Sequence, residues 1–163
     1  MSNSSDIEEI FRPRPSGKTL VITVGNPYRS DDGVGPFIAA NVTNPRNHIL
    51  ILDAGERPES VVFKAIELKP GRTIIIDAAD FGGAPGEVRI IPESAVPDVI
   101  HSTHNFPLTV VSRMISDDTG AEVFFVGIQY ENMSYGEVLT SEVRASAEKL
   151  IGMISVQPSA GNT

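Results

Sequence analysis

The feature that most constrains the fold is an alternation of short apolar runs with amphipathic segments. Four runs rich in Ile and Val are short enough to predict strands: Leu20 to Val24, Ile49 to Leu52, Ile74 to Ile76 and Val123 to Ile128. Because these runs are apolar at nearly every position, we expect strands covered on both faces, as in a parallel sheet. The run from Glu87 to Ile90 alternates charged and apolar residues instead, which predicts an edge strand with one face in water.

The segments between these runs have the spacing of helices. Apolar residues recur at intervals of three and four in four segments: Val34 to Val42, Val61 to Leu68, Leu108 to Ile115 and Val143 to Ile154. Thr140 or Ser141 is expected to cap the last of them. Strands and helices in this order predict one α/β domain over residues 18–155, with three α/β/α layers, a mostly parallel sheet and an edge strand. Residues 1–17 and 156–163 are tail-like in composition.

The composition excludes several classes of function. The 163 residues fit one domain, and 13 Lys and Arg against 21 Asp and Glu give a net charge of −8, which argues against a nucleic-acid partner. Cysteine is absent from the sequence, so any metal must be bound by oxygen and imidazole ligands. The start is polar and acidic, and no apolar run approaches the roughly 20 residues that cross a bilayer. We therefore expect a cytoplasmic protein without membrane insertion.

Acidic residues gather where the predicted strands end. Asp31 and Asp32 lie in a turn-rich loop after the first strand, Asp53 and Asp77 end the second and third, and Asp80 follows shortly after. In open α/β sheets, ligands bind beyond the carboxyl ends of the strands. One aspartate of the pair can cap the next helix, and a strand-end aspartate can bond to loop backbone alone. A cap needs only one aspartate, so the second aspartate of the pair and the gathering of acidic residues at one edge of the sheet favour a functional site.

Three histidines are available as imidazole ligands. His48 precedes the second strand, at the opposite edge, and is expected to be a solvated loop residue. His101 and His104 lie ahead of the helix that begins near Pro107, where a loop or cap role is the alternative to ligation. Two carboxylates and one imidazole suit a divalent ion and leave coordination positions open for a substrate. Ligands this dispersed have no diagnostic spacing, so position alone does not choose among these residues.

Four motifs in order carry a resemblance to a known family. They are Val24-Gly25-Asn26-Pro27 through Asp31-Asp32-Gly33-Val34-Gly35-Pro36, then Ile76-Asp77-Ala78-Ala79-Asp80, then Pro85-Gly86-Glu87-Val88-Arg89, and Ser102-Thr103-His104-Asn105 with Pro107-Leu108. Over residues 19–154 the chain resembles the hydrogenase maturation endopeptidases, which trim the C-terminal extension from the large-subunit precursor of nickel-iron hydrogenases. The last motif looks most like the subgroup that serves formate-hydrogenlyase-type hydrogenases.

The resemblance implies a site and a substrate. It maps the family's metal ligands and catalytic residues onto Asp32, Asp77 and His104. It implies that nickel already inserted in the precursor is the recognition element, borrowed from the substrate, and that other divalent ions can occupy the site. Our hypothesis is that the shared ion positions the scissile peptide, with Asp32 or Asp77 available as base.

Two departures and two alternatives accompany the resemblance. Asp53-Ala54-Gly55 stands where the family usually has Asp-Gly-Gly, which bears on the loop lining the cleft, and the N-terminal tail has no counterpart in compact members. The aromatic residues near the cleft are candidates for substrate specificity, with local packing as the alternative role: Tyr28, Phe81 and Phe106. One alternative is a nickel-dependent maturation chaperone that does not cut. The other is a nucleoside-phosphorylase-like enzyme, which needs an anion pocket that the acidic cluster disfavours.

Overall fold

The computed structural model describes residues 3–100 and 106–158, and these form a five-stranded sheet in the order β2-β1-β3-β5-β4. The strands are β1 Thr19–Val24, β2 Ile49–Gly55, β3 Arg72–Ala79, β4 Val88–Ile91 and β5 Glu122–Gln129. The first three and β5 are parallel, whereas β4 runs antiparallel to β5 at the edge. The predicted parallel strands and the predicted edge strand are therefore confirmed.

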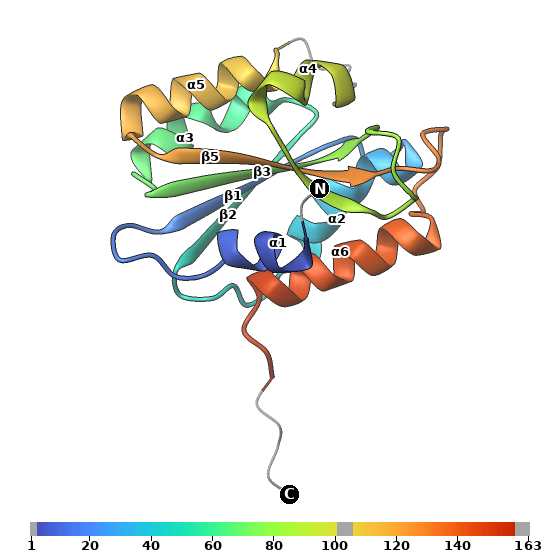
Figure 1. The fold of residues 1–163 in the computed structure, drawn as a ribbon, viewed down its shortest axis with the longest axis horizontal. Helices are drawn as coiled ribbons and strands as arrows, with labels where there is room; N and C mark the ends of the chain where they lie inside the picture. Colours follow the sequence, from blue (N-terminus) through green and yellow to red (C-terminus); the bar gives the residue numbers. More distant parts are fainter. Residues whose placement is uncertain (1–2, 101–105, 159–163) are drawn as a thin grey trace, which may run out of the picture.

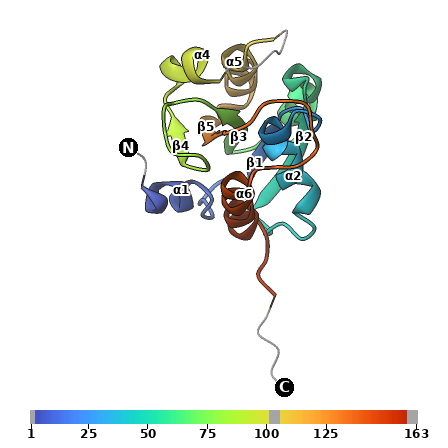
Figure 2. The same cartoon turned by 90° about the vertical axis from the view of Figure 1, so that its right-hand side faces the viewer.

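Helices cover both faces of the sheet and make three layers. In the described part of the chain they are α1 Ser4–Ile10, α2 Val34–Asn41, α3 Val62–Glu67, α4 Val96–Val99, α5 Leu108–Thr119 and α6 Ser141–Ile154. Short 3-10 turns precede three of them: η1 Ser30–Gly33, η2 Pro58–Val61 and η3 Glu93–Ala95. Figures 1 and 2 show α3, α4 and α5 on one face of the sheet, and α1, α2 and α6 on the other. This is the α/β/α arrangement that the sequence predicts.

The strand side chains alternate between two hydrophobic cores. Val21 of β1 packs in the core under α2 and α6, while Leu20 and Ile22 pack in the core under α3 and α5. Successive side chains of a strand point to opposite faces, so each central strand must be apolar at almost every position. Burying an Ile or Leu side chain contributes about 1.5–3 kcal/mol, so each buried position of these strands stabilises the fold.

The N-terminal segment differs from the prediction of a tail. Residues 4–10 form α1, and Ile7, Ile10 and Phe11 are buried in the core beside α6. These three residues have the spacing of one helical face, but seven residues are too few for an amphipathic stripe to stand out from the polar residues around it. Arg72 Nη1 donates to Ile10 O at 2.9 Å, and a ring nitrogen of His48 lies 2.7 Å from Phe11 O. His48 thus fastens α1 to the edge opposite the acidic residues.

The sheet brings the strand-end aspartates to one edge. Thr23 of β1 pairs with Asp53 of β2 on one side and with Ile76 of β3 on the other. Asp77, the next residue of β3, therefore lies level with the end of β1. The polar residues after each parallel strand consequently face the same edge, as the topology requires.

Candidate active site

Asp32 is folded back over the end of β1 by the turn that precedes α2. Its Oδ2 accepts a hydrogen bond from the Asn26 N–H at 3.1 Å. The turn is tight, because a Cβ atom at Gly25 would overlap the carbonyl oxygen of Asp32, and Gly25 has φ +148°. A glycine is required where two backbone segments approach this closely. The Asp32 side chain is half-buried, so it remains accessible at the edge of the sheet.

Asp77 occupies the end of the neighbouring strand β3 and is 2% exposed. Its Oδ1 accepts the Ala78 N–H at 2.8 Å. Because strand side chains alternate, Asp77 shares the face of Ile75 and Ala79, which is the face covered by α5. The structure therefore brings Asp32 and Asp77 to the ends of two adjacent strands, as the sequence predicts.

Asp31 has a different role from its neighbour. It is fully buried, and its carboxylate accepts hydrogen bonds from residues 131, 132 and 140, not from the first turn of α2. The expectation that one aspartate of the pair caps the next helix is therefore wrong, since Gly33 is the N-cap residue of α2 and makes no side-chain cap. The second aspartate of the pair, Asp32, lies at the edge of the sheet where ligands are expected.

Asp53 and Asp80 make local hydrogen bonds of the kind expected for strand-end aspartates. Asp53 Oδ1 accepts Thr23 Oγ1–H at 3.0 Å and the Gly55 N–H at 3.1 Å. Asp80 Oδ1 accepts the Gly82 N–H at 3.3 Å. Both side chains are exposed, and the bonds account for one oxygen of each.

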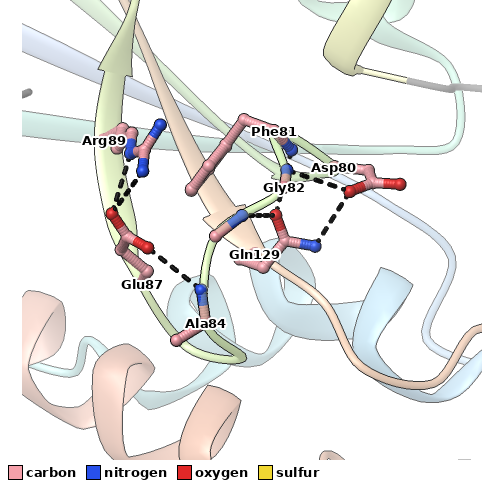
Figure 3. Close-up of polar contacts among 8 residues, drawn as sticks. Asp80, Phe81, Gly82, Ala84, Glu87, Arg89 and Gln129 are labelled. Atoms are coloured by element: carbon pink, nitrogen blue, oxygen red, sulfur yellow. Dashed lines mark hydrogen bonds and ion pairs between the residues drawn. The ribbon is translucent and has the colours of Figure 1, made fainter.

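The segment 80–87, which we call the β3–β4 loop, is held beside the site by Gln129 (Figure 3). Gln129 is 6% exposed, and its Oε1 accepts the N–H groups of Phe81 at 2.9 Å and Gly83 at 3.1 Å. Its Nε2 donates to Asp80 Oδ1 and to Tyr130 O, each at 3.2 Å. One buried amide thus joins the start of the loop to the end of β5.

The far end of the β3–β4 loop is held by an ion pair. Glu87 Oε2 accepts the Ala84 N–H at 3.0 Å, and Glu87 Oε1 accepts Arg89 Nε and Nη2 at 2.8 and 2.7 Å. The hydrogen bond from Arg89 lowers the pKa of Glu87. The Arg89 guanidinium also stacks over the Phe81 ring, 4.4 Å from its centroid, so Phe81 has a packing partner, whereas Tyr28 is 61% exposed.

Tyr130 is a polar residue of this edge that sequence reasoning missed. It directly follows β5, and burial raises its pKa, with further increases from the negative charges of Asp80 and Asp32. Both carboxylates therefore lie within electrostatic reach of the phenol. The signal that points to Tyr130 is its place directly after β5, at the edge of the sheet where Asp77 follows the apolar run of β3.

Two of the three histidines lie outside the described residues. His101 and His104 fall in the segment 101–105, so the structure leaves the predicted imidazole ligand untested. Within residues 3–100 and 106–158, no three His, Asp or Glu side chains are grouped closely enough to hold a metal ion. The described part of the site therefore contains the two predicted carboxylates, and the three-residue metal site stays a prediction.

Comparison with known proteins decides the family. The family model described as hydrogenase maturation protease matches residues 38–157. The hydrogenase 3 maturation protease of Escherichia coli K12 is 34% identical over 131 residues, covering 79% of this chain and 83% of that protein. The chain belongs to the hydrogenase maturation protease family.

Solved structures of the family share the fold. The crystal structure of a NiFe hydrogenase maturation protease from Thermococcus kodakarensis KOD1 matches with a TM-score of 0.78 at 30% identity, over 90% of this chain and 94% of that one. A crystal structure of the hydrogenase 3 maturation protease matches with a TM-score of 0.75 at 31% identity, over 86% of this chain and 90% of that one. The resemblance recognised from the four motifs is confirmed.

Membership makes this chain a peptide-bond hydrolase of hydrogenase maturation, which favours the peptidase over both alternatives. The family departure at Ala54 is accommodated by packing, since this side chain is buried in the core that α3 covers. None of the helices among the described residues is both long and apolar enough to cross a membrane.

Proposed function

We propose that this maturation protease removes the C-terminal extension of a nickel-iron hydrogenase large-subunit precursor after nickel has been inserted. The observation that supports this is the placement of Asp32 and Asp77 at the ends of two neighbouring strands. Asp77 lies on the face covered by α5, and the segment leading into α5 contains His104.

The chemistry of these side chains suits an ion that is borrowed and returned. Two carboxylates and one imidazole bind divalent ions less tenaciously than thiolates, and three ligands leave coordination positions open. We therefore assign Asp32, Asp77 and His104 to the nickel of the precursor, with other divalent ions as competitors. The nickel is part of the substrate in this proposal and not a resident cofactor.

The two carboxylates differ in exposure, which suggests a division of work. Asp77 is buried and fixed by the Ala78 N–H, so it is suited to hold the substrate's ion in one orientation. Asp32 is half-buried and reachable, so it is the better candidate for the base that accepts a proton from the attacking water.

The cytoplasmic location and the precursor as partner remain predictions of the sequence.

The decisive experiment is a cleavage assay with purified precursor, supplied with or without nickel, read by the intact mass of the large subunit. We expect shortening of the nickel-loaded precursor only. His104→Ala should abolish this shortening, because it removes the imidazole ligand. His48→Ala removes the histidine at the opposite edge of the sheet and should leave cleavage intact.

Two outcomes contradict the proposal. Cleavage by His104→Ala at the wild-type rate excludes the assigned ligand set. Equal shortening of precursor with and without nickel excludes nickel as the recognition element.

A further inference from the structure

A single buried carboxylate closes the loop between β5 and α6 at both of its ends. At the start of the loop, Asp31 Oδ2 accepts the N–H groups of Glu131 at 2.9 Å and Asn132 at 3.0 Å. At its end, Asp31 Oδ1 accepts the Thr140 N–H at 2.8 Å. The Thr140 hydroxyl lies 3.0 and 2.9 Å from the two carboxylate oxygens, to which it donates its one hydrogen. We call residues 131–140 the β5–α6 loop.

Main-chain hydrogen bonds join the same two segments. Ser30 N–H donates to Gly136 O at 2.8 Å, Asp31 N–H to Asn132 O at 3.0 Å, and Gly136 N–H to Tyr28 O at 2.9 Å. Figure 2 shows the loop passing beside the start of α2 before it reaches α6. The turn that carries Asp32 and the β5–α6 loop are thus one connected unit.

The contact between the two loops replaces the usual side-chain cap of α6. Thr140 is the N-cap residue of α6, yet its side chain makes no cap and donates to Asp31 instead. Ser30 has φ +52°, a left-handed conformation that costs a non-glycine residue energy, and its hydroxyl donates to Ser134 O at 2.8 Å. The contact between the two loops therefore outweighs both the capping preference of Thr140 and the backbone preference of Ser30.

A carboxylate is the appropriate group for this position. Glu131, Asn132 and Thr140 all donate hydrogen bonds to Asp31, and an ionised carboxylate only accepts. A fully buried charge is costly unless its hydrogen bonds are complete, so loss of any donor destabilises the whole arrangement. The loop is therefore held in one conformation, which presents Tyr135 and Val138 to solvent at 91% and 69% exposure.

The arrangement also shapes the surface beside Asp32. A hollow of about 330 Å³ lies between the turn and the loop, with Pro27 and Gly33 on one wall and Glu137 and Leu139 on the other. Displacing the loop would remove the second wall. The shape of the surface that a substrate meets next to Asp32 thus depends on a residue that no substrate touches.

We propose that Asp31 is a positioning residue of the peptidase site, which holds the β5–α6 loop against the turn that bears Asp32 so that the loop forms one wall of the precursor-binding surface. This inference rests on the proposed function, because it assumes that the precursor is cut beside Asp32. Asp31 acts through the loop and does not contact the substrate.

The test is Asp31→Asn in the full chain. Asn matches the shape but places an NH₂ group against backbone N–H donors. Amide hydrogen exchange of residues 131–140 should accelerate at least about tenfold, and kcat/KM for the nickel-loaded precursor should fall about tenfold to a hundredfold. KM should change more than kcat, because the bond between the Asn26 N–H and Asp32 is untouched.

A second, milder variant tests the proposal if Asp31→Asn does not fold. Thr140→Val keeps the branched shape and the backbone N–H but removes the hydroxyl, and should shift exchange and KM in the same direction by about threefold to tenfold. Thr119→Val is the matched control. Its hydroxyl donates to Ile115 O and accepts the Ala121 N–H at the opposite edge. It should lower thermal stability without altering exchange at 131–140 or KM.

The outcomes separate this proposal from the proposed function. Asp31→Asn and Thr140→Val with wild-type exchange at 131–140 overturn it, as does faster exchange accompanied by wild-type KM and kcat. A wild-type chain that leaves the precursor uncut overturns the proposed function, and the exchange rates then still decide whether Asp31 holds the loop.

Discussion

Two loops flank the candidate site, and each is held by one buried polar side chain of opposite character. The β3–β4 loop is held by Gln129, a neutral amide, whereas the β5–α6 loop is held by Asp31, a carboxylate. Gln129 both accepts and donates, so it joins loop N–H groups to the oxygen atoms of Asp80 and Tyr130. Asp31 only accepts, and the N–H groups of Glu131, Asn132 and Thr140 donate to it.

The difference shows how the placement of the supports decides what one residue controls. The β3–β4 loop has a second support, distant from Gln129, in the Glu87–Arg89 pair and the stacking of Arg89 on Phe81. The β5–α6 loop returns twice to the same carboxylate, and its other bonds to the turn come from residues 28–31 themselves. We therefore expect the β3–β4 loop to tolerate weak perturbations and the β5–α6 loop to respond to any change at Asp31.

The largest effect on stability is expected from reversing the polarity at Gln129. Gln129→Glu replaces two donors by an acceptor that faces Asp80 Oδ1 and Tyr130 O, and should lower the free energy of unfolding at pH 7 by about 4 kcal/mol. Burial and the charge of Asp80 raise the pKa of the introduced carboxyl. The loss should therefore shrink as the pH falls toward 5, because the protonated form can donate.

Urea unfolding at pH 7 and pH 5 measures this loss. Gln157→Glu makes the same chemical change at an exposed position, where the amide donates to Gly152 O, and should cost about 1 kcal/mol. An equal loss at both pH values would mean that the introduced carboxyl stays in one protonation state.

A smaller effect is expected from adding a methyl group at the close approach of the β3–β4 loop to α6. A Cβ atom at Gly86, which has φ +83°, would overlap the Glu142 carbonyl oxygen, so Gly86→Ala should cost about 2–3 kcal/mol. Gly82 has φ +72° but nothing within 4 Å, so Gly82→Ala should cost only about 1 kcal/mol. Similar losses at the two positions, measured by urea unfolding, would show that the loop moves away from α6 without cost.

The smallest effect is electrostatic and concerns Tyr130, which lies between the two loops. Since Asp80 and then Asp32 raise its pKa, Asp80→Asn should lower the pKa of Tyr130, and Asp32→Asn should lower it less. The ring-carbon chemical shift of Tyr130 followed against pH measures both changes. A pKa that does not fall in either variant would contradict the placement of the phenol near these carboxylates.

The strands and the position of the site could be predicted because their signals are local. An apolar run such as Ile74 to Ile76 has few alternatives to a strand buried on both faces, and parallel strands place their carboxyl ends at one edge. This rule gathered Asp32, Asp77 and the other strand-end aspartates at one edge, and the family resemblance then selected Asp32 and Asp77 among them. The short helix α1 escaped prediction because seven residues carry too little periodicity, and its burial depends on the sheet that it covers.

The sequence by itself determined the α/β/α class, the strands, four of the helices and, through its motifs, the family, because each of these is written in short runs of neighbouring residues. Only the tertiary structure decided which of two adjacent aspartates is buried. Asp31 and Asp32 have the same side chain. They differ because a set of N–H donors about a hundred positions away in the chain binds Asp31. Residue spacing along the sequence does not reveal a contact between segments so far apart.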